Sequence, residues 1–345
     1  MTNNSNVILE VKNLNVEFTT DDGVVHAVNN VSYKVERGKT LAIVGESGSG
    51  KSVSSLAVMG LLTGSNAKVT GEVFFNETEL VGSDPEVVRK LRGDEIAMIF
   101  QDPLSALHPY YTIGTQLIEA VLVHNDIKDD AAHARAKEML ERVGIPSVDQ
   151  RMDEYPHQLS GGMRQRVMIA MALINDPEVL IADEPTTALD VTVQAQILDL
   201  LRELQKEFGT AIVLITHDLG VVADLADEVM VMYGGSVVEH AEVRDLYYQP
   251  QMPYTWGLLA SVPQISDKQG QLDPIPGSPP SLLRLPPGCV FAPRCTFKDQ
   301  VPGAKCSTDF PDLISVSENH EARCHLTKDQ RTSIRIERNI GKANQ

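Results

Sequence analysis

Residues 45–52 of this 345-residue chain have the pattern G-x-x-x-x-G-K-[ST], which is typical of a phosphate-binding loop. They follow the short apolar run 41–44 and precede a helix predicted over 53–62. The glycines let the backbone curl so that N–H groups point at phosphate oxygens, and the positive helix end adds to the attraction. We expect Lys51 to bridge the β- and γ-phosphates and Ser52 to hold Mg²⁺. The alternative is a Gly/Ser-rich turn.

Two acidic residues, Asp183 and Glu184, follow a second apolar run at 179–182. In a parallel sheet the carboxyl ends of the strands carry the ligand site. We therefore expect Asp183 to hold Mg²⁺ through water and Glu184 to polarise the attacking water as general base. The alternative is an acid pair that caps the helical stretch that follows.

Polar side chains follow two more apolar runs. His217 comes after the run 211–216, and Gln101 comes after the run 96–100. A neutral imidazole at this edge could contact the γ-phosphate and order the water, and Gln101 could contact Mg²⁺ or the water. Taken singly, each is also explained as a structural or capping residue.

A second glycine-rich helix start consists of Leu159, Ser160, Gly161, Gly162, Met163, Arg164 and Gln165. Ser160 suits an N-cap, and the glycines expose backbone N–H groups, so this is a second anion-binding device. The chain then has two such helix starts and one phosphate loop. Either this is a capped helix after a loop, or it serves a nucleotide held by a second subunit.

Strands that alternate with helices must position these residues. The candidate strands, which suit a sheet covered on both faces, are the runs 41–44, 96–100, 179–182, 211–215 and 229–232. Between them lie amphipathic patterns such as Ile197, Leu200, Leu201 and Leu204. The alternation predicts a layered α/β core.

Other segments depart from this alternation. Residues 7–18 alternate as a strand whose phase slips near Asn13, which predicts a bend or bulge. Residues 113–143 and 160–175 are predicted to be helical without an intervening strand. After about residue 250 the Pro-, Gly- and Ser-rich texture predicts a module with little regular structure, and residues 327–345 are predicted to be frayed.

Composition restricts the class of protein. Lys plus Arg number 30 and Asp plus Glu number 47, which gives a net charge of −17 and makes duplex nucleic acid a poor partner. No run approaches the roughly 18 apolar residues that span a bilayer. The polar N-terminus lacks the basic and apolar regions of a signal peptide. We expect a chain that stays in the cytoplasm and reaches a membrane only through a partner.

Together these motifs resemble the ATP-binding subunit of an ABC transporter, in the family's order over residues 7–240. The correspondence covers the Walker A loop 45–52, the Q-loop Gln101, the signature 159–165, the Walker B acids, the D-loop Ala188, Leu189 and Asp190, and the switch residue His217. The resemblance implies that two such subunits enclose two ATP molecules, each between one Walker A loop and the other subunit's signature. It also implies that Phe18 stacks on adenine; the alternative is a strand core residue.

The resemblance assigns a role to each site residue. The nucleotide contacts are expected at Phe18, Gly45, Glu46, Ser47, Gly48, Ser49, Gly50, Lys51, Ser52 and Val53. Catalysis is expected from Glu184, His217, Lys51 and Gln101, with Mg²⁺ held through Ser52, Gln101 and Asp183. ATP closes the pair of subunits and hydrolysis reopens it.

The region after 240 resembles the C-terminal extension of oligopeptide and dipeptide permease ATPases, at residues 252–259, 275–277 and 286–295. This implies an ATPase on the cytoplasmic face of the membrane that powers peptide import, with a non-identical ATPase, two transmembrane permease subunits and an extracytoplasmic binding protein as partners. Residues 104–112, beside Gln101, are the expected permease-docking segment. Nickel, glutathione or oligosaccharide cargo, or a non-transport ABC ATPase, are the alternatives.

Four cysteines, Cys289, Cys295, Cys306 and Cys324, lie in this extension at spacings unlike paired C-x2-C zinc knuckles. The resemblance implies a [4Fe–4S] cluster, with Zn²⁺ on the same ligands as the alternative. The expected fold is thus an α/β ABC-type P-loop nucleotide-binding domain over 1–250, with a β-rich N-terminal flank and a helical subdomain at about 85–170. A metal-stapled module of irregular structure is expected over 251–345.

Overall fold

The computed structural model describes residues 6–187, 189–261, 275–338 and 340–341. Its contacts divide the chain into two compact units, each discontinuous in sequence. Unit 1 consists of Met1–Glu10, Lys34–Thr40 and Phe74–Ile215, and unit 2 consists of Val11–Tyr33, Leu41–Val73 and Thr216–Gln345.

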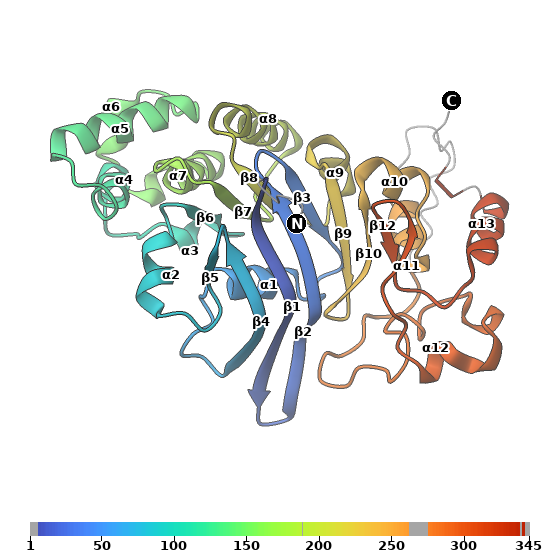
Figure 1. Ribbon diagram of the computed structural model, residues 1–345. Helices are drawn as coiled ribbons and strands as arrows, with labels where there is room; N and C mark the ends of the chain where they lie inside the picture. The colour runs from blue at the N-terminus through green and yellow to red at the C-terminus, as the bar shows by residue number, and fades with distance from the viewer. Residues whose placement is uncertain (1–5, 188, 262–274, 339, 342–345) are drawn as a thin grey trace. The chain divides into compact units, whose positions relative to one another are not determined.

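Unit 1 contains three parallel strands in the order β8-β7-β6 (Figure 1). These are β6 (Ile96–Ile99), β7 (Val179–Asp183) and β8 (Ala211–Thr216). All of their residues are buried, as expected for parallel strands covered on both faces. The three predicted runs are therefore confirmed as strands.

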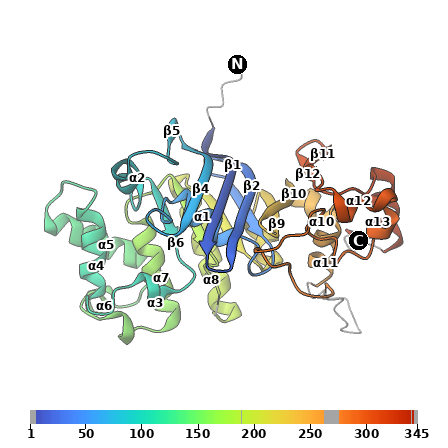
Figure 2. The same ribbon diagram turned by 90° about the horizontal axis from the view of Figure 1, so that it is seen from below.

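The helices of unit 1 are α2 (Pro85–Leu91), α3 (Pro103–Ala106), α4 (Ile113–Leu122), α5 (Asp129–Arg142), α6 (Val148–Met152), α7 (Gly161–Leu173) and α8 (Val191–Phe208). Of these helices, α2 precedes β6 in sequence and the others lie between β6 and β8. Helices α4 to α7 pack on one another (Figure 2). The helices predicted within 113–143 and 160–175 are confirmed, and so is the buried stripe of α8 at Ile197, Leu200, Leu201 and Leu204.

Unit 2 carries the strands that lead into the phosphate loop. Strand β3 (Thr40–Val44) pairs in parallel with β9 (Glu228–Tyr233), and β9 pairs antiparallel with β10 (Ser236–Glu242). The sheet continues through β12 (His320–Ala322) to β11 (Ile314–Ser317). Residues from the end of the chain thus extend the same sheet that positions the phosphate loop.

A second set of strands begins with β1 (Val7–Thr20) and β2 (Gly23–Glu36), followed by β4 (Ala67–Phe75) and the short β5 (Thr78–Glu79). The order is β2-β1-β4. Asn13 has φ +50°, and a Cβ on Gly71 would lie 2.4 Å from the Asn13 carbonyl oxygen. The irregularity predicted near Asn13 is therefore confirmed: Asn13 has a left-handed backbone conformation. The backbone of Gly71 packs closely against it.

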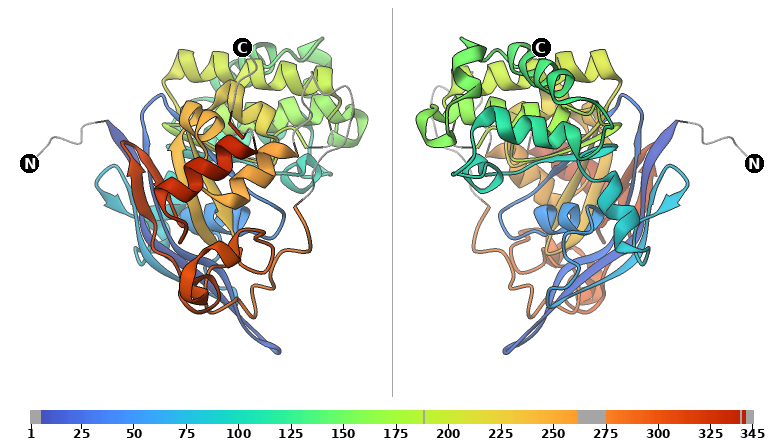
Figure 3. Two further views of the ribbon diagram at one scale, coloured as in Figure 1. Left: turned by 90° about the vertical axis from the view of Figure 1, so that its right-hand side faces the viewer. Right: turned by 90° about the vertical axis from the view of Figure 1, so that its left-hand side faces the viewer.

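The last part of unit 2 has more regular structure than the sequence suggested. It contains α9 (Leu219–Leu225), α10 (Val243–Tyr248), α11 (Pro253–Ala260), α12 (Lys305–Thr308) and α13 (Lys328–Glu337). Figure 3 shows α13, in red, beside the helices of this region, and Ile334 of α13 joins the same hydrophobic cluster as Leu246 and Trp256.

The prediction that residues 327–345 are frayed is wrong for residues 327–338. The Thr327 hydroxyl accepts from the Gln330 N–H at 3.3 Å, and the Gln330 side chain accepts from the Thr327 N–H at 2.9 Å. This capping box satisfies two free donors at the start of α13, and Ile334 supplies an apolar anchor. Residues 339 and 342–345 lie outside the described part of the chain.

A buried hydrogen bond joins β12 to β10. Glu239 on β10 and His320 on β12 lie 2.8 Å apart, and both side chains are buried. Glu239 also accepts from the backbone N–H groups of Gln251 at 2.5 Å and Met252 at 3.1 Å, so both of its carboxylate oxygens are hydrogen-bonded. Among the described residues, no helix is long and apolar enough to cross a membrane.

Candidate functional site

The phosphate loop runs from the end of β3 to the start of α1 (Lys51–Val58). Gly45 has φ +154° and Gly50 has φ +100°. A Cβ at Gly45 would lie 2.2 Å from the Met232 carbonyl oxygen, and a Cβ at Gly50 would lie 2.3 Å from that of Ala27. Only glycine fits at these two positions, because the loop packs directly on the backbones of β9 and β2.

Lys51 lies inside this loop. Its Nζ donates to the carbonyl oxygens of Gly45 at 2.7 Å and Glu46 at 3.0 Å, and the residue is only 5% exposed. An ammonium group that donates to backbone carbonyl oxygens here is suited to donate to phosphate oxygens instead. Ser52 and Val53 follow half-buried in the first turn of α1, so the predicted helix begins earlier than residue 53 and ends earlier than 62.

The remaining loop residues differ in exposure. Ser49 is buried, and its carbonyl oxygen accepts from the Gly235 N–H at 3.1 Å. Ser47 and Gly48 are exposed at the tip of the loop. Phe18, the predicted adenine contact, is half-buried on β1, and its role stays a prediction. The structure brings the predicted Walker A residues together in one closed loop.

Glu46 has two partners that the sequence analysis missed. The Arg294 guanidinium donates to its carboxylate through Nη1 at 2.6 Å and Nη2 at 3.1 Å. The Glu46 N–H donates to the Tyr254 hydroxyl oxygen at 2.9 Å. Both partners lie more than 200 residues further along the chain, so no local pattern could have indicated the contact.

In unit 1, β7 ends at Asp183, and Glu184 follows it. Glu184 has φ +48°, a conformation that costs energy in a non-glycine residue and that recurs at functional sites. Its Oε2 accepts from Gln101 Nε2 at 2.9 Å and from the Thr187 hydroxyl at 2.8 Å. Gln101 and the predicted general base are therefore brought into direct contact.

The helix after Walker B does not use the acid pair as its cap. The Asp190 carboxylate accepts from the N–H groups of Thr192 at 3.1 Å and Val193 at 3.0 Å, and it begins α8. The capping alternative for Asp183 and Glu184 is therefore wrong. Of the other D-loop residues, Leu189 is half-buried and Ala188 lies outside the described residues.

The signature region begins α7. Ser160 caps the helix by accepting from the Met163 N–H at 3.3 Å, and both Ser160 and Gly161 are exposed. A Cβ at Gly161 would meet nothing within 4 Å. The first turn therefore offers backbone N–H groups to solvent or to another molecule.

The rest of the signature anchors this helix start. Arg164 donates to the Pro156 carbonyl oxygen at 2.7 Å, and the buried Gln165 donates to the carbonyl oxygen of Pro185, next to Glu184. Leu159 is buried, and a Cβ at Gly162 would press on Val193 of α8 at 3.2 Å. The exposed start of α7 is thus fixed relative to the residue that follows the predicted base.

His217 follows β8 and is exposed. The helix after it, α9, is capped by Asp218, whose carboxylate accepts from the Gly220 N–H at 2.8 Å. The capping alternative for His217 is therefore wrong. A structural role and a role at the γ-phosphate stay open for it.

Cys289 and Cys306 belong to one hydrophobic cluster in unit 2, Cys295 and Cys324 pack against it, and all four are free thiols. The Cys289 N–H donates to the Cys306 carbonyl oxygen at 2.9 Å. Burial raises the pKa of Cys295 to about 11 and that of Cys324 to about 12, and the neighbouring Cys289 thiol adds to both pKa shifts. The predicted metal site is not confirmed, because in the described part of the chain no three His, Cys, Asp or Glu side chains form a group that could hold an ion.

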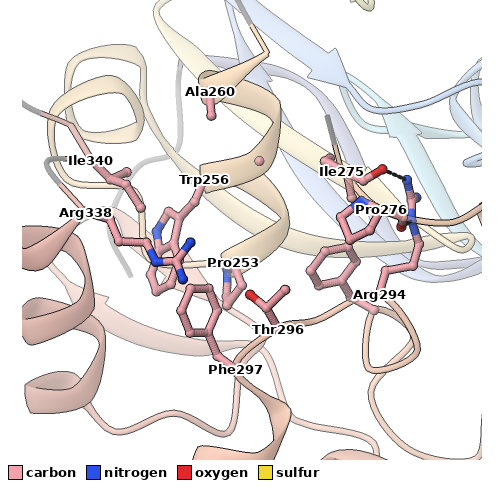
Figure 4. A pocket seen from close by; sticks show the side chains of 12 residues that line it. Pro253, Trp256, Ala260, Ile275, Pro276, Arg294, Thr296, Phe297, Arg338 and Ile340 are labelled. Atoms are coloured by element: carbon pink, nitrogen blue, oxygen red, sulfur yellow. Dashed lines mark hydrogen bonds between the residues drawn. The ribbon is translucent and has the colours of Figure 1, made fainter. Parts of the chain in front are cut away.

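A pocket of about 520 Å³ lies in the C-terminal part of unit 2 (Figure 4). Trp256, Phe291 and Phe297 give it aromatic walls, and the Arg338 guanidinium lies 5.0 Å from the Phe297 ring centroid. Arg294 lines the same pocket and donates to the Ile275 carbonyl oxygen at 3.3 Å. The pocket therefore borders the arginine that holds Glu46.

Unit 1 has a shallower hollow of about 790 Å³ beside the predicted docking segment. It is lined by Pro109, Tyr110, Gln150, Asp153, Glu154, Tyr155, His157 and Gln158. Tyr110 is 82% exposed, and Leu104, Tyr111 and Tyr155 are also exposed apolar or aromatic side chains. Exposed aromatic residues around a hollow are typical of a surface that receives another protein.

Comparison with known proteins matches the two parts of the chain separately. Residues 28–187 match the family described as ABC transporter, and residues 238–301 match the family described as oligopeptide/dipeptide transporter, C-terminal region. The chain is 51% identical to the dipeptide transport ATP-binding protein DppD of Bacillus subtilis over 94% of this chain and 96% of that protein. It is 52% identical to the oligopeptide transport ATP-binding protein OppD of Haemophilus influenzae, over 94% and 99% respectively.

Solved structures agree with this assignment. A dimeric ATP-binding cassette, described as a post-hydrolysis state bound to ADP and Pi, superposes with a TM-score of 0.62 at 30% identity. The superposition covers 68% of this chain and 99% of the cassette.

Proposed function

Because this chain belongs to the oligopeptide and dipeptide family of ABC transporter ATP-binding subunits, we propose that it hydrolyses ATP to power the import of short peptides through a membrane permease. The observation that carries the proposal is the closed phosphate loop around Lys51 in a chain that also has a Glu184 base and an exposed signature helix. The peptide cargo rests on the names of the relatives and on the C-terminal family match.

The residues divide the chemistry among them. Lys51 and the N–H groups at the start of α1 bind the phosphates and stabilise the charge that develops on the γ-phosphate. Glu184 takes the proton of the attacking water, and the Gln101 and Thr187 donors orient its carboxylate. His217 orders the same water.

Mg²⁺ is expected with the nucleotide. Ser52 and Gln101 offer neutral oxygen donors, and Asp183 offers a buried carboxylate, which is the hard oxygen set that Mg²⁺ prefers. When bound, the ion neutralises charge on the β- and γ-phosphate oxygens.

The signature is proposed to bind the nucleotide of a second, related ATPase subunit. Support comes from the exposed Ser160 and Gly161 at the start of α7, which have room in front of them. The hollow lined by Tyr110, Tyr155 and their neighbours is the proposed permease contact, which would hold the chain at the cytoplasmic face of the membrane. Two transmembrane subunits and an extracytoplasmic binding protein would complete the importer.

The four cysteines are proposed to hold a [4Fe–4S] cluster that stabilises the C-terminal part of the chain. All four residues lie in or against one hydrophobic core, although no three of their side chains are grouped in the described residues as an ion site requires. A bound metal would have to draw the thiols together, and it would favour their thiolate forms despite the raised pKa values. Anaerobically purified protein should contain about four irons per chain and absorb in the visible. Zinc without iron would instead support the alternative metal.

Uptake in cells tests the cargo. Cells that lack this chain, supplied with either the wild type or the Glu184→Gln variant, are given a labelled tripeptide and, as the control, a labelled free amino acid. We expect only the wild type to restore tripeptide uptake, with amino acid uptake equal in both. If tripeptide uptake is independent of the chain while nickel, glutathione or oligosaccharide uptake depends on it, the peptide assignment is wrong.

A further inference from the structure

The phosphate loop contains a carboxylate close to where the phosphates of ATP are expected, that of Glu46. Glu46 is the second residue of the loop, and its carbonyl oxygen accepts from Lys51 Nζ at 3.0 Å. A free carboxylate at this place would repel the polyphosphate of ATP, because like charges at short range disfavour one another. Something must therefore neutralise Glu46 and fix its direction.

Arg294 meets both requirements. Its two terminal nitrogens donate to the two carboxylate oxygens of Glu46, and the side chains are 6% and 25% exposed. A bidentate guanidinium pair has one favoured geometry, so it fixes direction as well as charge. A lysine would supply the charge without this geometry.

The guanidinium is itself held by several acceptors. Its Nε donates to the Pro276 carbonyl oxygen at 2.7 Å, and Nη1 donates to the Tyr233 hydroxyl at 3.2 Å. The Tyr233 ring centroid lies 5.8 Å from the guanidinium carbon. Figure 4 shows Arg294 beside Ile275 and Pro276, on the border of the aromatic pocket. The arginine is therefore a rigid part of the C-terminal segment.

Tyr254 holds the backbone of the same loop residue. Its hydroxyl oxygen accepts from the Glu46 N–H at 2.9 Å. The ring is buried among aromatic neighbours, with centroids 4.5 Å from Tyr233 and 5.4 Å from Phe291. One residue of the phosphate loop is thus held at its main chain by α11 and at its side chain by residue 294.

We propose that Arg294 and Tyr254 are positioning residues for ATP binding, which neutralise and fix Glu46 so that the C-terminal segment completes the phosphate site. The inference rests on the proposed function only in assuming that the loop binds ATP. It does not depend on the cargo. It assigns to the C-terminal segment a direct part in nucleotide affinity.

A double-mutant cycle on the full-length chain tests the proposal. Equilibrium titration with a fluorescent ATP analogue and Mg²⁺ should show affinity lowered about tenfold in Arg294→Gln, or about 1.4 kcal/mol, relative to the wild type. Glu46→Gln is the second single variant of the cycle, and its own effect on affinity is the reference for the double variant. Adding Arg294→Gln to Glu46→Gln should lower affinity by less than about threefold, because the unpaired carboxylate is then gone. A loss on that addition as large as in Arg294→Gln alone would overturn the electrostatic role, and so would an unaffected Arg294→Gln.

Two more measurements separate positioning from folding and from the proposed function. The control Arg338→Gln changes an exposed arginine of the same pocket and should leave affinity unchanged. In the assembled complex, Arg294→Gln should raise KM for ATP with kcat changed less than about twofold, because Arg294 touches no reacting atom. A fall in kcat at unchanged KM would overturn the proposal. Wild-type chain that binds ATP without supporting peptide uptake would overturn the proposed cargo alone.

Discussion

Two helix starts in this chain are proposed to bind phosphate, and their surroundings differ. Helix α1 begins at Gly50, which has no side-chain cap, and the loop before it is closed around a buried Lys51 and braced by Arg294 and Tyr254. Helix α7 begins at Ser160, which caps its own helix and is exposed to solvent with nothing above the following glycine.

The difference indicates how each helix start is used. The contacts of the α1 loop come from its own chain, so we expect it to bind a nucleotide without a partner. Helix α7 is anchored through Gln165, and a Cβ at Gly161 would meet nothing within 4 Å, so we expect its start to bind a phosphate that another molecule supplies. Substitutions in the α1 loop should alter the ATP affinity of the single chain. Substitutions at the start of α7 should alter ATP turnover by the assembled protein.

The largest effect is expected from Glu184→Gln, which keeps the size of the side chain and removes the proposed base. Turnover should fall about 1,000-fold, because a positioned general base contributes on that order. ATP affinity should stay within about threefold, because Glu184 is not part of the α1 loop. Phosphate release measures the fall in turnover, and ATP titration of the same preparation measures the affinity. Near-normal turnover would refute Glu184 as the base.

Lys51→Met changes the α1 loop and leaves the start of α7 intact, so it should lower the ATP affinity of the single chain. It removes a buried cation that donates to the loop carbonyls, so ATP affinity should fall about 100-fold, or about 2.7 kcal/mol. The matched control is Lys68→Met, since Lys68 is an exposed lysine of the same unit and should leave affinity unchanged. Equal losses in the two variants would mean that net charge, not the loop, governs binding.

Gly161→Glu should leave the α1 loop intact and disable the α7 start. A side chain fits there without a clash, and its charge repels a phosphate. We expect the single chain to bind ATP as the wild type does, while the turnover of the assembled complex falls about tenfold. Gly161→Ala is the uncharged control. If Gly161→Glu weakens ATP binding by the single chain, the division of labour is wrong.

The smallest effect is expected on stability, from removal of the Asp190 side chain that caps α8. Asp190→Ala should lower Tm by about 2 °C, because the cap of α8 is worth about 1 kcal/mol. Asp190→Asn should hold Tm close to the wild type, since asparagine caps as well. A melting curve for each variant is sufficient. Equal losses of Tm in both would mean that the charge, not the cap, stabilises the helix.

The parallel strands β3, β6, β7, β8 and β9 could be predicted from the sequence because parallel strands buried on both faces are continuous apolar runs. The strands β2, β4, β5, β10, β11 and β12 were not predicted individually. The break at Asn13 was also readable as a slip in alternation. The local motifs could be predicted for the same reason: their residues are neighbours in the chain. The contact between Gln101 and Glu184 was expected only as a shared sheet edge, and the structure supplied the hydrogen bond.

Other features could not be predicted, or were missed. The Arg294–Glu46 pair joins residues 248 positions apart, and nothing in the local sequence marks it. Helix α13 was missed although Thr327 and Gln330 have capping-box spacing, because its apolar content is low and Ile334 alone forms the buried anchor. The raised thiol pKa values also depend on burial by residues distant in sequence.

ATP-dependent association tests the central claim most directly. The Glu184→Gln chain is mixed with the related ATPase subunit purified alongside it, and sedimentation velocity is recorded with and without ATP and Mg²⁺. We predict a stable pair only with ATP, and its loss when Gly161→Glu is added. Association that ignores ATP, or that survives Gly161→Glu unchanged, would contradict an ATP shared between the α1 loop of one subunit and the α7 start of the other.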